Sequence, residues 1–113
     1  MERKAHRLPS NAIASLRKDG KVLFFSFQKS ILRDNDVNKF RFSTIVSKKF
    51  SASAVTRNLI KRRIYHALQE IQAPERLCGV DMVCITNPTI HSATYQEIKD
   101  SLDKVITKYN AKK

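Results

Sequence analysis

The segment from residue 54 to residue 71, AVTRNLIKRRIYHALQEI, constrains the fold more than any other part of the chain. With about 3.6 residues per helical turn, its apolar side chains fall into one stripe about 100° wide. These side chains are Ile60, Ile64, Ala67, Leu68 and Ile71. A helix with one apolar stripe must bury it against another layer, so the remaining sequence must supply a sheet or further helices.

The polar part of this predicted helix is strongly cationic. Arg57, Lys61, Arg62 and Arg63 stand within seven residues, with Arg57 and Lys61 on one flank and Arg63 on the other. The helix dipole disfavours cations in the first turns, and no acidic residue stands four positions from the first three of them. A solvated helix face is the alternative, but phosphate groups would offset the repulsion. The cluster therefore predicts a phosphate-binding surface.

The charge of the whole chain is distributed in the same one-sided way. The 113 residues carry a formal net charge of +12. Residues 37–69 contain eight lysines and arginines and no acidic residue. Such a field attracts polyanions, and it favours nucleic acid over an anionic membrane or an acidic protein. No apolar run approaches the roughly 18 residues that span a bilayer, and residues 1–14 do not resemble a signal peptide. We expect a cytoplasmic protein.

The remaining elements are predicted from periodicity and from turn residues. A helix is expected over 8–18, capped by Ser10 or Asn11 and stopped by Gly20. Strands are expected over 21–28 and 40–47, joined by a polar connection and pairing as a hairpin.

The second half of the chain adds a central strand and a last helix. Residues 80–86 form an apolar strand that Asn87 and Pro88 end. The last helix begins at Thr94, with Glu97 completing a capping box. The prediction is a single domain over residues 1–113, an α+β fold built as a small two-layer α/β sandwich of order α-β-β-α-β-α.

The strand expected over residues 21–28 contains three phenylalanines, whose role has two interpretations. Its alternation places Leu23, Phe25 and Phe27 on one face and Val22 and Phe24 on the other. One face must pack in the core, and the other face could stack nucleobases. The sequence alone does not decide which face does which.

Catalysis by the chain itself finds little support. His66 on the basic helix could serve a nuclease together with Lys61, but nothing pairs with it except Glu70, at ordinary helix spacing. The aspartates show no metal-binding spacing. Cys78 and Cys84 are read as free thiols of a reducing compartment. We therefore predict no catalytic residue and no metal ligand.

One stretch is similar to a known family, the protein component of bacterial ribonuclease P. The similarity begins in the strand end Val46-Ser47-Lys48-Lys49 and continues through Ala54-Val55-Thr56-Arg57-Asn58 and Lys61-Arg62. Arg7-Leu8, the strand over residues 79–88 and Tyr95 in the last helix extend it over nearly the whole chain.

The resemblance implies a protein that binds a catalytic RNA and assists 5′ maturation of precursor tRNA. The RNA would perform the hydrolysis with Mg²⁺, and neither DNA nor a membrane is an expected partner. The fold would contain an unusual left-handed βαβ crossover, and the order would be α-β-β-(β)-α-β-α. The RNA-binding residues implied are Lys48, Lys49, Arg57, Asn58, Lys61, Arg62 and Arg63. The residues implied for a cleft that takes the single-stranded 5′ leader are Ile13, Leu16, Phe25 and Tyr65.

This chain also departs from the family pattern. Leu59 and Tyr65 stand where the family often has arginine, and Ile13 and Leu16 stand near its usual aromatics. The link after Gly20 is short, and the sequence leaves open whether one short strand is missing there. The alternative function is a general RNA-binding or ribosome-associated module that acts without a catalytic RNA.

Overall fold

The computed structural model describes residues 6–25, 27–46 and 53–111. In these ranges the chain forms five strands, four α-helices and one 3-10 helix. In chain order they are β1 (His6–Arg7), α1 (Ser10–Asp19), β2 (Lys21–Phe25), β3 (Gln28–Asp34), β4 (Arg41–Ile45), α2 (Ala54–Glu70), α3 (Ala73–Arg76), β5 (Val80–Thr86), η1 (Pro88–Ser92) and α4 (Tyr95–Ala111).

The strands form one mixed sheet in the order β1-β4-β5-β3-β2. β4 runs parallel to β1 and to β5, whereas β3 runs antiparallel to β5 and to β2. The predicted central position of the strand over residues 80–86 is confirmed, because β5 lies between β4 and β3. Since β4 and β5 are parallel, α2 and α3 form a βαβ crossover between them; its left hand stays a prediction.

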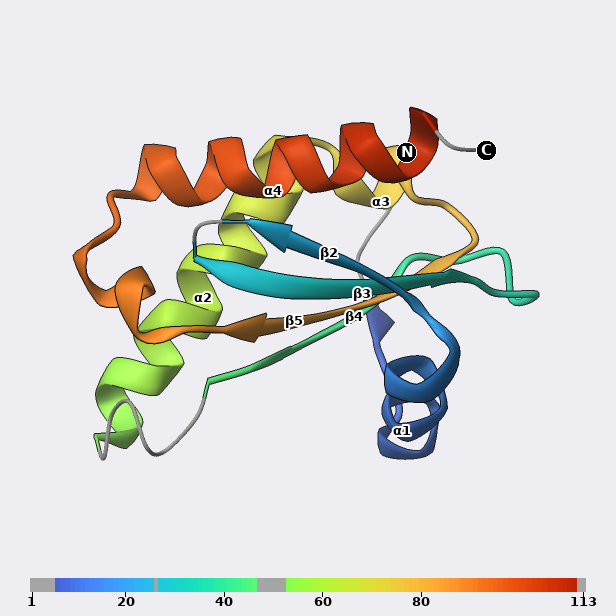
Figure 1. The fold of residues 1–113 in the computed structure, drawn as a ribbon, viewed down its shortest axis with the longest axis horizontal. Helices are drawn as coiled ribbons and strands as arrows, with labels where there is room; N and C mark the ends of the chain where they lie inside the picture. The colour runs from blue at the N-terminus through green and yellow to red at the C-terminus, as the bar shows by residue number, and fades with distance from the viewer. Residues whose placement is uncertain (1–5, 26, 47–52, 112–113) are drawn as a thin grey trace.

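Helices cover both faces of the sheet (Figure 1). α2 and α4 pack on one face over the main core, and α1 packs on the other face. The predicted stripe of α2 is confirmed for Ile60, Ile64, Ala67 and Leu68, which are all buried. On the opposite face, α1 contributes Leu16 to a smaller core cluster. The α+β class and the helix-on-sheet packing are therefore confirmed.

The hairpin predicted between residues 21–28 and 40–47 is wrong. Phe25 pairs with Gln28, so the chain reverses there and β3 follows at once. Apart from Gln28, which ends the strand predicted over residues 21–28, β3 falls in the predicted polar connection, and it lies between β2 and β5. Its composition hid it, because Gln28 and Ser30 are buried polar residues. Gln28 Nε2 donates to Ser101 Oγ of α4 at 3.5 Å, and the Cys84 thiol donates to Gln28 Oε1 at 3.1 Å.

After Gly20, where the sequence leaves open whether a short strand is missing, β2 begins at the next residue. Gly20 ends α1 as predicted, and an added Cβ would lie 2.5 Å from Ile31 Cγ2 and 2.6 Å from Leu16 O. Only glycine therefore allows α1 to meet the sheet so closely. Neither predicted residue caps α1 with its side chain, since Pro9 holds the N-cap position.

The capping box that opens α4 is confirmed. The Thr94 amide donates to Glu97 Oε1 at 2.9 Å, and the Glu97 amide donates to Thr94 Oγ1 at 3.1 Å. Within the residues that the structure describes, no helix has the length and apolar character needed to cross a bilayer.

Candidate nucleic-acid interface

The first half of α2 presents its cations to solvent. The Ser53 hydroxyl accepts the Thr56 amide at 3.3 Å, and the first turn contains no acidic residue. Asn58, Lys61, Arg62 and Arg63 are exposed, whereas Arg57 is half-buried and already engaged by a partner. Over the described ranges, no ion pair or hydrogen bond uses the side chain of Lys61, Arg62 or Arg63.

A groove runs between α2 and the β1 edge of the sheet, and we call it the basic groove. It is lined by His6, Arg7, Phe42, Ser43, Thr44, Lys61, Arg62 and Tyr65 and encloses about 540 Å³. β1 pairs only with Arg41 and Phe42, so the following residues of β4 are left open to this groove. The groove therefore combines three permanent cations with hydroxyl groups and one tyrosine ring.

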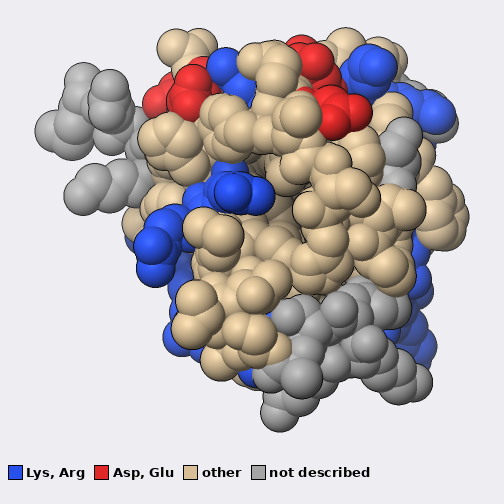
Figure 2. Space-filling view, turned by 90° about the vertical axis from the view of Figure 1, so that its left-hand side faces the viewer, with Lys and Arg blue, Asp and Glu red and all other residues tan. Residues whose placement is uncertain are grey.

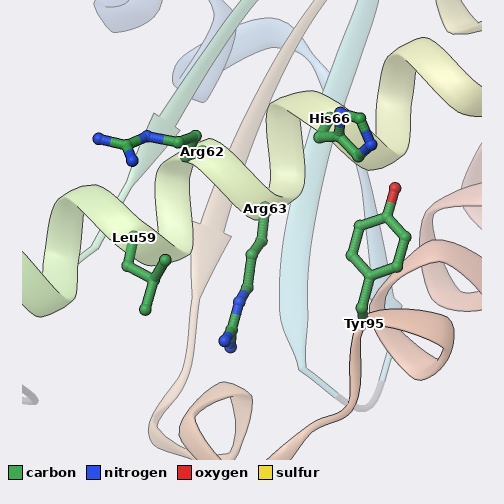
Figure 3. Close-up of a pocket in the computed structure, with 5 residues that line it drawn as sticks. All are labelled: Leu59, Arg62, Arg63, His66 and Tyr95. Carbon is green, nitrogen blue, oxygen red and sulfur yellow. The ribbon is translucent and has the colours of Figure 1, made fainter.

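A second hollow lies on the other flank of α2, and we call it the α2–α4 pocket. Its lining residues are Leu59, Arg62, Arg63, His66 and Tyr95, around a volume of about 390 Å³. Arg62 therefore borders both hollows. Figure 3 shows Arg63 hanging between Leu59 and Tyr95, whereas Arg62 extends in another direction from the helix. The predicted separation of Lys61 and Arg63 onto opposite flanks is confirmed.

Arg41, one of the cations in the stretch of residues 37–69 that lacks acidic residues, forms an ion pair within the protein. Asp81 is buried, and its carboxylate accepts from Arg41 Nε and Nη2, both at 2.7 Å, and from Asn35 Nδ2 at 2.7 Å. The hydrogen bond to Asp81 raises the pKa of Arg41 above its ordinary value. Arg41 therefore orders the end of the sheet beside β1 and is not free to bind phosphate.

Acidic side chains gather away from these cations. α4 carries Glu97, Asp100 and Asp103. Figure 2 shows acidic side chains along the top of the molecule, where α4 runs. Below them, the same view shows a basic side chain beside a hollow in the surface. The sheet-covering helices thus differ in charge, with α2 basic and α4 mixed.

On the α1 side of the sheet, one row of residues is partly exposed, and we call it the open sheet row. Cross-strand pairing aligns Phe24, Lys29, Ile85 and Ile45 over four strands. Phe24 is 73% exposed, and the other three are partly buried. The adjacent row is covered by α1, since Ile31 and Val83 are buried with Leu16. An exposed aromatic ring beside a lysine is a surface on which a nucleobase can stack.

The four residues expected to share a leader cleft do not lie together. Leu16 of α1 is fully buried against the sheet, and Ile13 packs at the margin of the same cluster. Phe25 lies on the opposite face of β2, against the core under α4. Tyr65 lies in the basic groove. The four residues therefore lie on different surfaces, since the sequence pattern over residues 21–28 does not indicate which face of the strand α1 covers.

Other predicted residues have simpler outcomes. Lys48 and Lys49 lie outside the described residues. Conversely, sequence reasoning missed His6 and Arg7 as lining residues of the basic groove. Arg7-Leu8 supports the family resemblance only, and β1 is a two-residue strand, too short for any periodicity to predict.

Hydrogen bonds and ion pairs around Glu70 connect α2 to α4. His66 Nε2 lies 3.0 Å from the Glu70 carboxylate, which also accepts from the Tyr95 hydroxyl and from Lys99 Nζ at 3.2 Å. The hydrogen bond from Tyr95 is the main cause that lowers the pKa of Glu70, followed by that from Lys99. In the described ranges, no three His, Cys, Asp or Glu residues are grouped as metal ligands.

Comparisons with known proteins agree with this geometry. The family model described as "Ribonuclease P" matches residues 2–110. The ribonuclease P protein component of Streptococcus pneumoniae serotype 4 is 35% identical over 96 residues, covering 79% of this chain and 76% of the relative.

Two solved structures are similar as well. The RNase P protein of Staphylococcus aureus has a TM-score of 0.79 and 27% identity, covering 92% of this chain and 94% of that one. The RNase P protein of Thermotoga maritima has a TM-score of 0.78 at 21% identity, covering 91% and 96%, and supports the fold. Because the family model matches almost the full length of the chain, the chain belongs to the family of ribonuclease P protein components.

Proposed function

We propose that the basic groove and the exposed cations of α2 hold the catalytic RNA of ribonuclease P, and that the open sheet row receives the 5′ leader of precursor tRNA. The chain is a component of the ribonuclease P holoenzyme, the endoribonuclease of tRNA 5′ maturation. The proposal assigns the two RNA ligands to two surfaces of this chain. In this proposal, Mg²⁺ is bound by the RNA subunit. The holoenzyme acts in the cytoplasm.

The observation that carries the first assignment is the set of unpaired cations on α2. Lys61, Arg62 and Arg63 have no acidic partner among the described residues, and Arg7 faces the first two across the groove. Guanidinium groups bind phosphate in a bidentate manner, and phosphate contacts position a protein without reading sequence. Such contacts suit a large folded RNA that the protein must orient.

The second assignment is supported by the open sheet row. A single-stranded leader has unstacked bases, and bases bind to aromatic side chains irrespective of sequence. Phe24 is the exposed ring of this row, and its cross-strand neighbour Lys29 is placed to meet a phosphate. Phe24 rather than Phe25 is the proposed stacking residue, because the Phe25 side chain faces α4 on the opposite side of the sheet.

Reconstitution tests the function as a whole. The chain is combined with the catalytic RNA of its own genome, and cleavage of precursor tRNA is measured at low Mg²⁺. We expect cleavage at the 5′ end of the mature tRNA sequence with both components, and none from the chain alone. Cleavage by the chain without RNA would contradict the proposal.

A pair of neighbouring substitutions tests the leader assignment. Phe24→Ser should lower the holoenzyme's affinity for precursor tRNA relative to mature tRNA by about 5- to 150-fold, the contribution of one stacked base. Phe25→Leu, on the other face of the same strand, should leave this ratio unchanged. If Phe25→Leu lowers the ratio and Phe24→Ser does not, the leader binds on the α4 side.

A further inference from the structure

The α2–α4 pocket combines an apolar floor with a cationic rim. Leu59, Arg63 and His66 lie on one flank of α2, and Tyr95 comes from the first residue of α4 (Figure 3). Leu59 is 42% exposed, which is unusual for a leucine beside a folded core. The volume of about 390 Å³ is within the range of about 300–1,000 Å³ that small-ligand sites occupy.

The aromatic wall of this pocket is held in place. The rings of His66 and Tyr95 lie 5.7 Å apart between centroids, at an interplanar angle of 43°. Both side chains are tied to the Glu70 carboxylate, which Lys99 also binds. Burial, and then the hydrogen bond to Glu70, raise the pKa of Tyr95 to about 12, so the phenol stays neutral. A wall fixed in this way can bind a flat ligand without first losing side-chain freedom.

The rim supplies the complementary charge. Arg63 hangs between Leu59 and Tyr95, and Arg62 stands on the crest that separates this pocket from the basic groove. Within the described part of the chain, neither guanidinium has a partner. The Glu70 carboxylate, which lies next to the aromatic wall, already has three partners. The pocket therefore offers flat apolar surfaces and unneutralised positive charge at the same place.

We propose that the α2–α4 pocket binds one unpaired nucleotide of an RNA, with its base against Tyr95 and Leu59 and its phosphate beside Arg63 and Arg62. The proposal rests on the proposed function, since it specifies one contact that α2 makes to RNA. It differs from phosphate binding along the basic groove because it requires recognition of a base. Base contact of this kind is sequence-tolerant, and it fixes one bulged or single-stranded nucleotide of a folded RNA against the protein.

The test uses the full chain and two small probes. Adenosine 5′-monophosphate and ribose 5-phosphate carry the same sugar phosphate, and only the first carries a base. Each is titrated against the chain while NMR follows the ring signals of Tyr95, His66 and, for the basic groove, Tyr65. We expect the nucleotide to shift the signals of Tyr95 and His66 and to bind at least about fivefold more tightly than ribose 5-phosphate.

Substitutions at the pocket, with one control outside it, assign the effect to the pocket. Tyr95→Ala should remove at least about fivefold of the affinity for the nucleotide, and Tyr95→Phe should retain most of it. If Tyr95→Ala does not fold, Leu59→Ser replaces it, because Leu59 is partly exposed and its substitution leaves the core intact. Val55→Ala is the matched control, since Val55 is an exposed apolar residue of the same helix that does not line the pocket.

Four outcomes of these titrations would overturn the proposed nucleotide site. Equal affinity for the two probes would mean a phosphate site without base recognition and would overturn the proposal. Shifts confined to Tyr65, or a hexaglutamate peptide that shifts Tyr95 and His66 more strongly than the nucleotide, would overturn it as well. A holoenzyme that cleaves precursor tRNA while its protein fails these titrations would refute this inference alone and leave the proposed function standing.

Discussion

Removing two cations from the basic groove should change how RNA affinity depends on salt. Lys61→Ala combined with Arg62→Ala deletes two exposed side chains that have no partner among the described residues. Neither belongs to the buried stripe of α2, so folding should be retained. For a duplex ligand, each phosphate contact contributes about 0.9 to the magnitude of the slope of log affinity against log salt concentration. The double variant should therefore lower the slope by about 1.8.

The assay is equilibrium binding of the catalytic RNA at several salt concentrations. Between 50 and 200 mM salt, the affinity of the unaltered chain should fall roughly 12-fold more than that of the variant, since a fourfold change in salt is raised to the power of about 1.8. The matched control is Lys104→Ala with Lys108→Ala, which removes two exposed cations from α4. An equal loss of slope in the control, or an unchanged slope in the groove variant, would refute the reasoning.

Two further predictions concern stability and reactivity. Thr94→Ala removes the hydroxyl that accepts the Glu97 amide and keeps the backbone hydrogen bond to Glu97, so it should lower the free energy of unfolding by about 0.5–2 kcal/mol in denaturant titration; a loss below the measurement error would mean that the hydroxyl contributes nothing. Burial raises the pKa of the Cys84 thiol to about 12, so at pH 8 only the partly exposed Cys78 should react quickly with a thiol reagent. Rapid modification of two thiols per folded chain would contradict this.

The sequence predicted the elements whose patterns are local. The apolar stripe of α2, the central strand β5 and the capping box at Thr94 follow from periodicity and from cap chemistry within a few residues. The segregation of Lys61 and Arg63 onto opposite flanks also follows from helix geometry alone. These features do not depend on knowing which strand pairs with which.

The elements that were missed depend on distant partners. β3 contains buried Gln28 and Ser30, and Gln28 is satisfied by Ser101 and Cys84, far along the chain. A polar strand of this kind has no local signature. Because β3 was missed, the face on which Phe25 lies could not be related to α1, and the leader cleft was assembled from residues on different surfaces. The basic groove escaped notice for the same reason, since His6 reaches α2 only through the pairing of β1 with β4.

The unequal charge of α2 and α4 also determines the electrostatic attraction that acts on a polyanion close to the protein. The molecule measures 36 × 28 × 26 Å, whereas the screening length at physiological ionic strength is about 8 Å. An approaching RNA therefore does not respond to the net charge of +12, but to the side of the protein that is nearest. Encounters through α4, whose charges are mixed, should receive little attraction and separate, while those through the basic α2 should be prolonged. The protein thus selects its own orientation during collision, before any specific contact has formed.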